Sequence, residues 1–463
     1  MTTSGTRRRV LPDQVLSSLS DYLDIGGGKA LAWARNVTAD RVIDELTRAG
    51  LRGRGGAGFP TGVKWRSILT GGGRHHYAVC NAAEGEPGTF KDRALIRANP
   101  YQVLEGLIVA ARTVGASEAF IAVKESFRPA WQRLTDAIAE IDAAGWLDGV
   151  GVTLVAGPEE YLFGEEKALL EVIEGNDPLP RWLPPYLHGL YVNAPQLGWQ
   201  AHDPEGGHVG EHVANPTLVN NAETLAQAAW IISHGADEFR STGTEQSPGT
   251  IVCTVVGDVV RPAVLEVSMG TPLQEVLQRC GGPRPGRKIK AVIPGVANAA
   301  LPAGSLATPL TFEDMEAAGS GLGAAGFIVY DDTACMVDVT ATLSRFLYVE
   351  SCGQCLPCKL GTGHITGALE RIRDGSGSGA DVDVIAERLR IVADGNRCYL
   401  PVQEQNLVAS LLRLYPEDVT AHLEGTCTSH RGRIPTPKIV DLVEGVVTYD
   451  DRQEHKQPDW TYR

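Results

Sequence analysis

The chain carries two kinds of apolar pattern, one typical of strands and one typical of helices. Residues 250–256 and 263–267 are short runs rich in Val, and a Gly-Asp turn follows the first of them. Apolar runs bounded by turn residues predict the two strands of a hairpin. Residues 272–280 then show helical spacing and stop at Gly281, which predicts a helix ended by glycine.

Helical patterns also occur on both sides of this hairpin. Residues 39–49 predict a helix with an N-cap near Thr38 and a glycine stop at Gly50. Farther along, apolar residues follow the i, i+4, i+7, i+8 spacing of one buried helix face, at Val339, Leu343, Phe346 and Leu347. A similar pattern returns at 383–392, so we expect the C-terminal third to be mainly helical.

Length and charge narrow the class of protein. A chain of 463 residues suggests more than one domain, and 43% hydrophobic residues supply material for buried cores. The 42 basic and 56 acidic residues give a net charge of -14. This balance argues against a nucleic-acid partner, because phosphate binding needs a positively charged surface.

No apolar run has the length of a signal peptide or of a membrane span. The N-terminus is basic at residues 7–9 but leads into no apolar segment of that kind. We therefore expect a cytoplasmic protein with no direct membrane insertion. The odd number of cysteines, nine, also argues against a disulfide framework and favours metal binding by clustered thiols.

Three of the cysteines form one compact motif. Cys352, Cys355 and Cys358 have the spacing Cys-x2-Cys-x2-Cys. Structural zinc sites usually combine two separated Cys-x2-Cys pairs, whereas an iron–sulfur cluster takes several thiolates from one loop. A tetranuclear cluster needs a fourth ligand, and Cys398 in a turn-rich stretch is the best candidate. Zinc and three unligated core cysteines are the alternatives.

The remaining cysteines have plainer interpretations. Four cysteines have apolar or isolated sequence contexts, and we interpret them as small buried hydrophobic residues: Cys80, Cys253, Cys280 and Cys335. Cys427 lies near His430 and is compatible with a ligand pair, although we favour a surface thiol.

A glycine-rich loop follows the helix that is predicted to end at Gly50. Gly53, Gly55 and Gly58 match Gly-x-Gly-x-x-Gly, but a dinucleotide fingerprint should follow a strand instead. Residues without side chains let backbone amides approach a phosphate, and three cations add positive charge, Arg52, Arg54 and Lys64. The loop therefore favours phosphate or flavin binding over a flexible surface loop.

Five motifs occur in one order along the chain. They are GLRGRGGAGFPTG at 50–62, NAAEGEPGTFKDR at 81–93, YLFGEEKALL at 161–170, PTLVNNAETLA at 216–226 and ESCGQCLPC at 350–358. With these motifs the chain resembles the NADH-binding flavoprotein subunit of respiratory complex I and the diaphorase subunits of NAD-linked hydrogenases and formate dehydrogenases. The resemblance covers residues from about 22 to about 415.

The resemblance implies an α/β fold with three domains. We expect a Rossmann-like FMN-binding domain, a β-grasp domain of the SLBB-like type and a C-terminal helical bundle that holds the 4Fe-4S cluster. The corresponding boundaries are an N-terminal segment at 1–35, the FMN and NADH domain at 36–240, the β-grasp domain at 245–325, the cluster domain at 330–425 and a tail at 426–463. The tail is expected to form a short strand pair or to contact a partner.

The resemblance also implies a set of site residues. Along the glycine-rich loop, the residues expected to contact FMN or NAD(H) are Gly53, Arg54, Gly55, Gly56, Ala57, Gly58 and Lys64. Flavin hydrogen bonds are expected from Asn81, Asn220 and Asn221, and Glu84, Val219 and Thr224 complete the cofactor-binding set. The nicotinamide side would be lined by Tyr161 and Gly164 and by the catalytic candidates Glu86, Glu165 and Glu166. Phe59 and Tyr186 would sandwich the adenine.

Plainer interpretations remain for some of these residues. Glu165 and Glu166 also fit the acidic first turn of a helix. Asn220 and Asn221 fit a turn, and Tyr186 fits a core position.

The chain departs from the family pattern mainly on the flavin and nucleotide side. Ala83 replaces a carboxylate, Phe163 replaces a cysteine and Lys167 replaces a threonine. An insertion of roughly twenty residues precedes Pro216. Its histidines are compatible with a metal site, although their irregular spacing favours a polar loop: His202, His208 and His212.

The four cluster cysteines are intact, so electron transfer is the firmest expectation. The leading hypothesis is an oxidoreductase subunit that passes electrons between NAD(P)H and a ferredoxin or ferredoxin-like 2Fe-2S subunit within a hetero-oligomeric complex. FMN would take the hydride and release electrons singly to the cluster. The alternatives are an electron-transfer subunit that does not bind NADH and a structural iron–sulfur assembly subunit.

Overall fold

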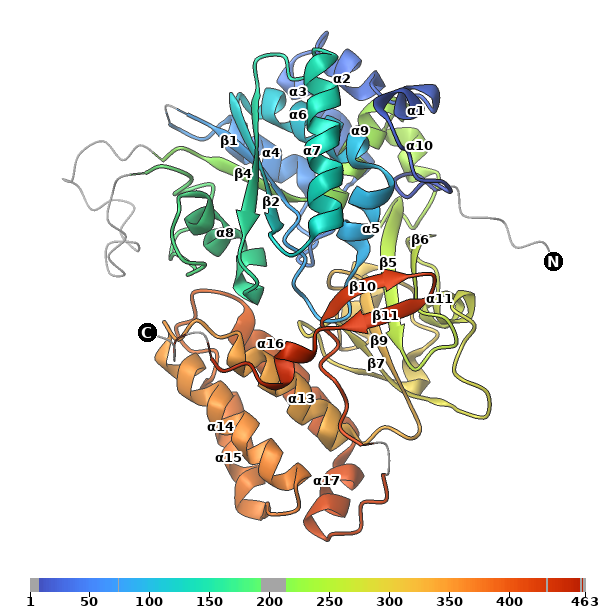
Figure 1. The fold of residues 1–463 in the computed structure, drawn as a ribbon, viewed down its shortest axis with the longest axis vertical. Helices are drawn as coiled ribbons and strands as arrows, with labels where there is room; N and C mark the ends of the chain where they lie inside the picture. Colours follow the sequence, from blue (N-terminus) through green and yellow to red (C-terminus); the bar gives the residue numbers. More distant parts are fainter. Residues whose placement is uncertain (1–7, 74, 193–213, 430–431, 459, 461–463) are drawn as a thin grey trace. The chain divides into compact units, whose positions relative to one another are not determined.

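A computed structural model describes residues 8–73, 75–192, 214–429, 432–458 and 460. The chain forms two compact units. The first comprises Met1–Gly85, Lys91–Val252 and Leu265–Gly270, and the second comprises Glu86–Phe90, Cys253–Val264 and Thr271–Arg463. Figure 1 colours both units along the sequence.

The first unit is built on a parallel four-stranded sheet in the order β3-β2-β1-β4. Its strands are β1 (Tyr77–Asn81), β2 (Glu118–Lys124), β3 (Gly151–Gly157) and β4 (Thr217–Asn221). The chain adds β2 on one side of β1 and β4 on the other, and Asn81 pairs with Asn221. Ligands of open parallel sheets bind beyond the carboxyl ends of strands at such a reversal of strand order.

Ten helices complete the described part of the first unit. They are α1 (Leu19–Asp24), α2 (Lys29–Ala34), α3 (Ala39–Ala49), α4 (Thr61–Leu69), α5 (Lys91–Ala98), α6 (Pro100–Val114), α7 (Arg128–Ala143), α8 (Glu166–Ile173), α9 (Ala222–His234) and α10 (Ala236–Arg240), with a 3-10 turn η1 (Tyr161–Gly164). Thr38 caps α3 and Gly50 ends it with a left-handed φ of 71°, which confirms both predicted boundaries.

Helices α6 and α9 pack very closely in the core of the first unit. Nearly every residue of α6 is buried. A Cβ added at Gly106 would lie 2.1 Å from the carbonyl oxygen of Leu225, so only glycine permits this approach of the two helices. The contact fixes the start of α9, which directly follows β4.

The region that follows has a five-stranded sheet in the order β6-β5-β9-β7-β8. Its elements are β5 (Thr250–Gly257), β6 (Ala263–Ser268), α11 (Leu273–Arg279), β7 (Ile289–Pro294), β8 (Leu301–Pro302), η3 (Ala303–Ser305), α12 (Phe312–Ala317) and β9 (Gly326–Asp331). The predicted strands and the helix that ends before Gly281 are confirmed.

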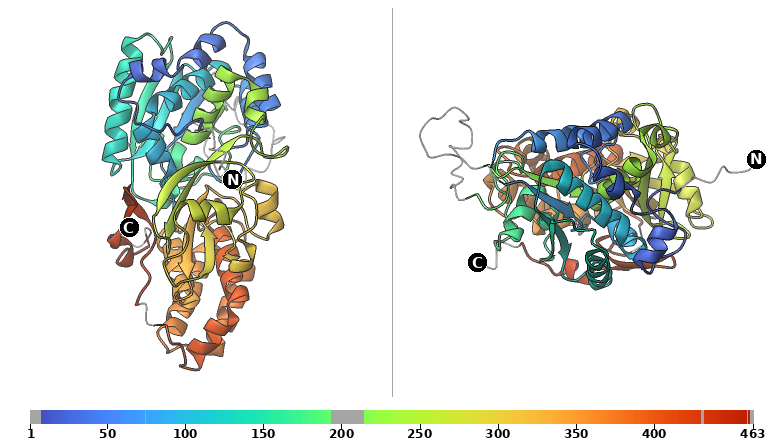
Figure 2. Two further views of the ribbon diagram at one scale, coloured as in Figure 1. Left: turned by 90° about the vertical axis from the view of Figure 1, so that its right-hand side faces the viewer. Right: turned by 90° about the horizontal axis from the view of Figure 1, so that it is seen from above.

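A helical bundle follows β9 in the second unit. Its helices are α13 (Met336–Val349), α14 (Leu356–Arg373), α15 (Gly379–Ile391), α16 (Leu400–Leu414) and α17 (Pro416–Leu423). Their core includes Ala341, Ile365, Leu369 and Val408. Val339, Leu343, Phe346 and Leu347 are buried on α13, as the sequence pattern predicted. Figure 2 shows these helices from two further sides.

The chain ends in a short tail of the second unit. The tail contains an antiparallel pair, β10 (Ile439–Val443) and β11 (Val446–Tyr449), followed by η4 (Asp451–Glu454). This confirms the predicted strand pair. Within the described residues, no helix combines the length and the apolar character needed to cross a membrane.

Candidate functional site

Four of the sequence motifs meet near the carboxyl ends of β1 and β4 in the first unit. The backbone N–H of Arg54 in the glycine-rich loop donates to Thr224 Oγ1 over 2.8 Å. Asn81 Nδ2, at the end of β1, donates to the Gly164 carbonyl over 2.8 Å. Lys64 and Glu166 form an ion pair with 2.9 Å between Nζ and Oε1. These contacts join segments that are distant in sequence into one site.

The glycine-rich loop is an ordered turn closed by its own backbone. Arg52 and Pro60 form an isolated antiparallel bridge, and Gly53 N donates to the Phe59 carbonyl over 2.9 Å. Gly58 has a φ of 62°, a conformation that favours glycine. A Cβ added at Gly55 would come within 3.2 Å of the Asn221 Cβ, so the loop backbone lies against the end of β4. This geometry suits close approach of a phosphate or ring.

The side chain of Arg54 serves the fold of the loop. Its guanidinium is buried, and one of its nitrogens donates to the carbonyl oxygen of Thr250 over 3.0 Å. The positive charge of Arg54 is therefore held inside the first unit. Lys64 remains a partly exposed cation of the loop region, paired with Glu166.

The two asparagines at the end of β4 are held by different partners. Asn220 Oδ1 accepts a hydrogen bond of 2.8 Å from the indole N–H of Trp65, which orients its amide. Asn221 Oδ1 accepts from Lys91 Nζ over 3.1 Å, and its Nδ2 donates to Asp92 over 2.6 Å. Asn221 also caps α9, so the pair marks a strand end followed by a helix.

Lys91 is the centre of a buried charge network behind Asn221. Its Nζ lies 2.8 Å from Asp92 and 3.0 Å from Glu223. Burial lowers the pKa of Lys91, but the carboxylates of Asp92 and Glu223 outweigh it and raise this pKa above its usual value. Sequence reasoning did not select Lys91 as a site residue, although it lies in the NAAEGEPGTFKDR motif. The available signal for Lys91 in the sequence was its position next to Asp92, where the two opposite charges open helix α5.

Glu165 and Glu166 lie at the start of a helix, as the plainer interpretation of the sequence held. Glu165 is the N-cap of α8 and accepts from the backbone N–H groups of Lys167 and Ala168, and Glu166 begins the helix. Burial raises the pKa of Glu165 to about 7, although Lys167 and the two N–H groups act against this shift. A carboxyl that titrates near neutrality beside Lys64 and Glu166 is a candidate for charge control at a ligand site.

The rings proposed for adenine stacking lie at the surface. Phe59 is 52% exposed and Tyr186 is 50% exposed, which excludes a core position for Tyr186. Phe163 is fully buried and would contact a Cβ added at Gly157, so the residue that replaces the family's cysteine fills the core beneath β3.

The other predicted residues have structural contacts of their own. Glu84 forms a buried ion pair with Arg93 at 2.8 Å. Val219 lies in the core of the sheet. Glu86 belongs to the second unit, where its Oε1 accepts from the backbone N–H groups of Val296 and Ala297. The insertion histidines, His202, His208 and His212, lie outside the described residues.

In the second unit, the cysteine motif surrounds the start of α14. Cys352 precedes the helix, Cys355 is its N-cap and Cys358 lies in its first turn. Burial, against a hydrogen bond from Ser351 and together with the neighbouring Cys352 and Cys355, raises the pKa of Cys358 to about 12. Their thiolates would repel one another without a metal, and an iron–sulfur cluster is bound by thiolates of this kind.

The loop that carries Cys398 is tied directly to this motif. Arg397 donates to Gln354 Oε1 over 2.9 Å, and Asn396 donates to the Cys398 carbonyl over 2.7 Å. Gln354 stands between Cys352 and Cys355, so the two loops meet. The arrangement fits a tetranuclear cluster held by Cys352, Cys355, Cys358 and Cys398.

The C-terminal tail supports the cysteine loop. Glu350, fully buried just before the motif, pairs with Lys456 at 2.9 Å and accepts from Gln453 over 3.0 Å. Trp460 covers Gly353, where an added Cβ would lie 2.7 Å from the indole, and Lys359 lies over the ring at 4.1 Å. The tail thus contacts the chain's own cysteine loop.

Glu404 on α16 is a buried carboxyl near Cys358. Its Oε1 accepts from Ser344 over 2.6 Å. Burial raises the pKa of Glu404 to about 8, while the Ser344 hydrogen bond lowers it. Folded protein therefore keeps the proton on Glu404 in a pH range where the unfolded chain has lost it.

Glu404→Gln should make the stability of the protein less dependent on pH. A raised carboxyl pKa in the folded state lowers stability as pH rises from about 4.5 to about 8, because the unfolded chain ionises first. Glutamine removes this penalty, which amounts to a few kcal/mol at most. In anaerobic thermal unfolding, the melting temperature of the variant relative to that of the parent protein should rise between pH 5.5 and about pH 8. The matched control is Glu387→Gln, an exposed carboxyl on α15. An equal pH slope in the parent and Glu404→Gln would contradict the assignment.

The fold and these two sites define a flavin- and iron–sulfur-containing electron-transfer protein. Three family models match the chain: a Nuo51 FMN-binding domain at residues 46–230, an SLBB domain at 252–293 and an NADH-ubiquinone oxidoreductase-F iron-sulfur binding region at 338–422. They confirm the predicted fold class.

Whole-chain relatives give the family. The chain is 37% identical to the second NADH-quinone oxidoreductase F-subunit of Rhizobium meliloti over 88% of this chain and 94% of the relative. It is 34% identical to NADP-reducing hydrogenase subunit HndC of Solidesulfovibrio fructosivorans over 89% of this chain and 82% of the relative. A solved NAD+-reducing [NiFe]-hydrogenase matches with a TM-score of 0.75 and 32% identity, over 88% of this chain and 67% of that chain.

The chain belongs to the family of NADH-quinone oxidoreductase F-subunits. It is an oxidoreductase subunit whose cofactors are FMN and a 4Fe-4S cluster. The relatives named above are subunits of multi-subunit complexes. These findings confirm the resemblance that the five sequence motifs indicated.

Proposed function

We propose that the chain exchanges electrons between a pyridine nucleotide and a ferredoxin-like 2Fe-2S subunit or ferredoxin. The observation that carries the proposal is the meeting of the four motifs at the ends of β1 and β4, through the contacts of Arg54, Asn81 and Lys64. FMN bound there supplies hydride acceptance and one-electron release, and the cluster supplies one-electron transfer. The protein's part is to bind, orient and tune the charge around both groups.

The proposal assigns a role to each element of the flavin site. The backbone of residues 53–58, together with Lys64, would hold phosphate or nucleotide, with Ala57 in the turn. Asn81, Asn220 and Thr224 would orient the flavin. Tyr161, Gly164, Glu165 and Glu166 would line the nicotinamide side, and the exposed rings of Phe59 and Tyr186 would stack on adenine.

Glu86 remains a candidate for the nicotinamide side, as the resemblance to the family implies. We also propose the boundaries between the flavin, β-grasp and cluster domains that the sequence predicts, and a cytoplasmic location.

Exposed apolar side chains next to the cluster cysteines support a protein partner. Leu356, Leu360 and Tyr399 are 64%, 46% and 54% exposed, and each lies one or two positions after a cluster cysteine. Exposed apolar side chains gathered at one place mark interaction surfaces. If a 2Fe-2S subunit docked there, the distance for electron transfer between its cluster and the 4Fe-4S cluster would be short.

Anaerobic titration with NADH tests the proposal. One equivalent of NADH should bleach the flavin absorption of the purified protein, with NADPH as the comparison. An unchanged spectrum with FMN retained would favour the alternative in which another subunit or ferredoxin supplies the electrons. Purified protein without flavin would favour a structural iron–sulfur subunit.

Glu165→Gln should weaken inhibition by NAD+ above neutral pH. With a pKa of about 7, Glu165 is mostly ionised at pH 8 and mostly neutral at pH 6. An ionised carboxylate favours the cationic nicotinamide ring of NAD+, so the effect of the substitution should be several-fold at pH 8 and small at pH 6. Inhibition constants for NAD+ measured at both pH values check this. An equal loss of NAD+ affinity at pH 6 and at pH 8 would instead indicate a structural effect of removing the cap of α8.

A further inference from the structure

A second group of thiols lies outside the iron–sulfur motif. Cys335, His422 and Cys427 each offer one ligand atom, and these atoms all lie within 4.8 Å of one another. Cys335 Sγ and His422 Nε2 are 3.0 Å apart. The matched iron–sulfur region spans 338–422, so neither cysteine belongs to it. The isolated core role predicted for Cys335 is therefore incomplete, because the structure gives it two potential co-ligands.

We propose that Cys335, Cys427 and His422 Nε2 bind one zinc ion, with water as the fourth ligand. Two thiolates and one imidazole form a ligand set that zinc uses in proteins. Tetrahedral bonds of about 2.3 Å to sulfur and about 2.0 Å to nitrogen place the ligand atoms about 3.6–3.8 Å apart. The present separations, at most 4.8 Å, bracket these values, so small side-chain movements suffice.

The backbone around the three residues is fixed before a metal binds. Cys335 is the N-cap of α13, and His422 lies in the last turn of α17. Cys427 follows that helix, and its N–H donates to the Ala421 carbonyl over 3.1 Å. Asp418 Oδ2 accepts from Met336 N over 2.8 Å, which joins the start of α13 to α17 next to the thiol. The site is therefore assembled from the start of α13, the end of α17 and the turn that follows α17.

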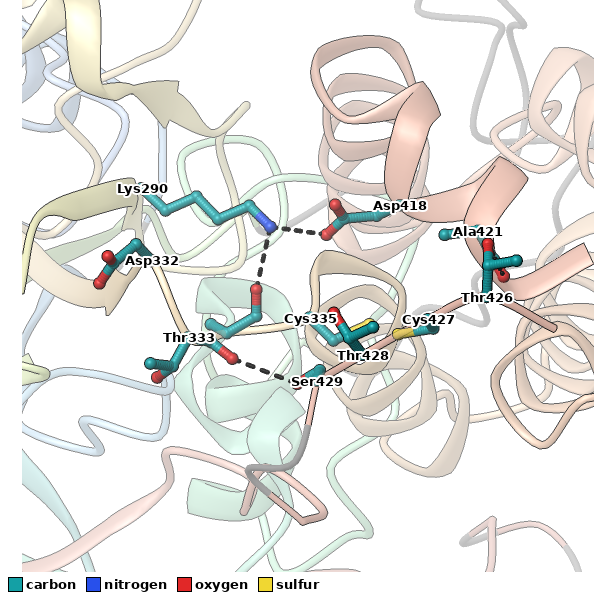
Figure 3. Close-up of a pocket in the computed structure, with 11 residues that line it drawn as sticks. Lys290, Asp332, Thr333, Cys335, Asp418, Ala421, Thr426, Cys427, Thr428 and Ser429 are labelled. Carbon is teal, nitrogen blue, oxygen red and sulfur yellow. Dashed lines mark hydrogen bonds and ion pairs between the residues drawn. The ribbon is translucent and has the colours of Figure 1, made fainter. Parts of the chain in front are cut away.

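A cavity of about 370 Å³ is lined by Cys335 and Cys427. Figure 3 draws the side chains that line it. Its walls include Thr333, Thr428 and Ser429. Asp418 faces the same cavity, but its Oδ2 already pairs with Lys290 Nζ at 2.7 Å. The remaining coordination position therefore faces polar space suited to a water molecule. His430, which sequence analysis considered beside Cys427, lies outside the described residues.

A carboxylate lies close to Cys335 along the chain, at Asp338 in the first turn of α13. Asp338 Oδ1 is buried and makes no hydrogen bond within the described structure, although Arg373 lies 4.0 Å away. Carboxylates beside a ligating histidine fix its orientation and strengthen it as a ligand.

Charge balance also favours a dication at this place. Binding of Zn²⁺ would form two Zn–S bonds and release two protons to solvent, leaving a neutral site. No electron is transferred, and the ion would fasten α13 to the end of α17.

Elemental analysis of the full-length protein tests the proposal. Protein purified anaerobically from zinc-supplemented medium should contain one zinc per chain besides the cluster iron. Cys427→Ser and His422→Gln should each lower zinc affinity at least about tenfold and leave the iron content unchanged. Cys280→Ser is the matched control, a buried thiol in the same unit that should leave zinc unchanged.

X-ray absorption at the zinc edge keeps the proposal testable even if a variant fails to fold. The parent protein should show two sulfur neighbours at about 2.3 Å and two nitrogen or oxygen neighbours at about 2.0–2.2 Å. Four sulfur neighbours would place zinc at the cluster cysteines and overturn the proposal. It is also overturned if the parent protein lacks zinc, if both variants keep it, or if peptide mapping finds a disulfide between Cys335 and Cys427.

Discussion

Cys398→Ala should abolish the four-iron signal in electron paramagnetic resonance of the reduced protein. The substitution removes one of four thiolates, and a methyl group cannot replace it as an iron ligand. The loop contact between Arg397 and Gln354 brings this cysteine to the motif of Cys352, Cys355 and Cys358, where no other thiol was assigned. We expect loss of essentially the whole signal, with the flavin absorption retained because FMN binds to the other unit.

The control for this prediction is Cys253→Ala. Cys253 is a fully buried cysteine in the same unit, on β5. Its loss costs packing and no iron ligand, so the four-iron signal should persist. An intact signal in Cys398→Ala would show that a different residue supplies the fourth ligand.

Lys91→Met should destabilise the first unit by about 3–5 kcal/mol, the cost of breaking a buried ion pair by removing one partner. The substitution leaves the buried carboxylates of Asp92 and Glu223 without their shared cation. It also removes a hydrogen bond to Asn221, so FMN content should fall together with stability. Denaturant unfolding and the flavin-to-protein ratio measure the two effects.

The loss of folding stability in Lys91→Met should grow as pH rises. Burial already raises the pKa of Glu223, and Lys91 is the largest influence that opposes it. Without Lys91 the carboxyl would keep its proton to higher pH, so the folded state would lose stability as the unfolded chain ionises. The matched control is Arg128→Met, whose partner Glu125 is exposed. That surface pair, 3.0 Å long, should contribute less than about 1 kcal/mol. Equal losses in both variants would contradict a buried network.

The elements with strong local signals were predictable from the sequence. The caps of α3, the β5 and β6 strands and the buried face of α13 each depend on nearby residues, so their patterns are visible in the sequence. The cysteine motif was equally visible, since three of its ligands lie within seven residues. The site residues assigned from the resemblance remain predictions, although contacts in the first unit bring many of them together.

Contacts between distant segments were not predictable in the same way. Cys335 and His422 are separated by 87 positions, and nothing in either local sequence marks them as partners. The sequence places Lys91 in a recognised motif, but it does not reveal that Lys91 pairs with Glu223, which lies 132 positions away on α9. Burial changes the chemistry of such residues, and burial depends on the whole fold.

The attachment of Lys456, Gln453 and Trp460 to the cysteine loop bears on how the protein can be handled. An affinity tag fused after residue 463 would be attached to the segment whose Lys456 pairs with Glu350. A tag fused before residue 1 would not alter this segment. Trimming of the last residues by a protease would likewise strip the indole from Gly353 and open the cysteine loop to oxygen. Purification schemes for this chain should therefore carry the tag at the N-terminus.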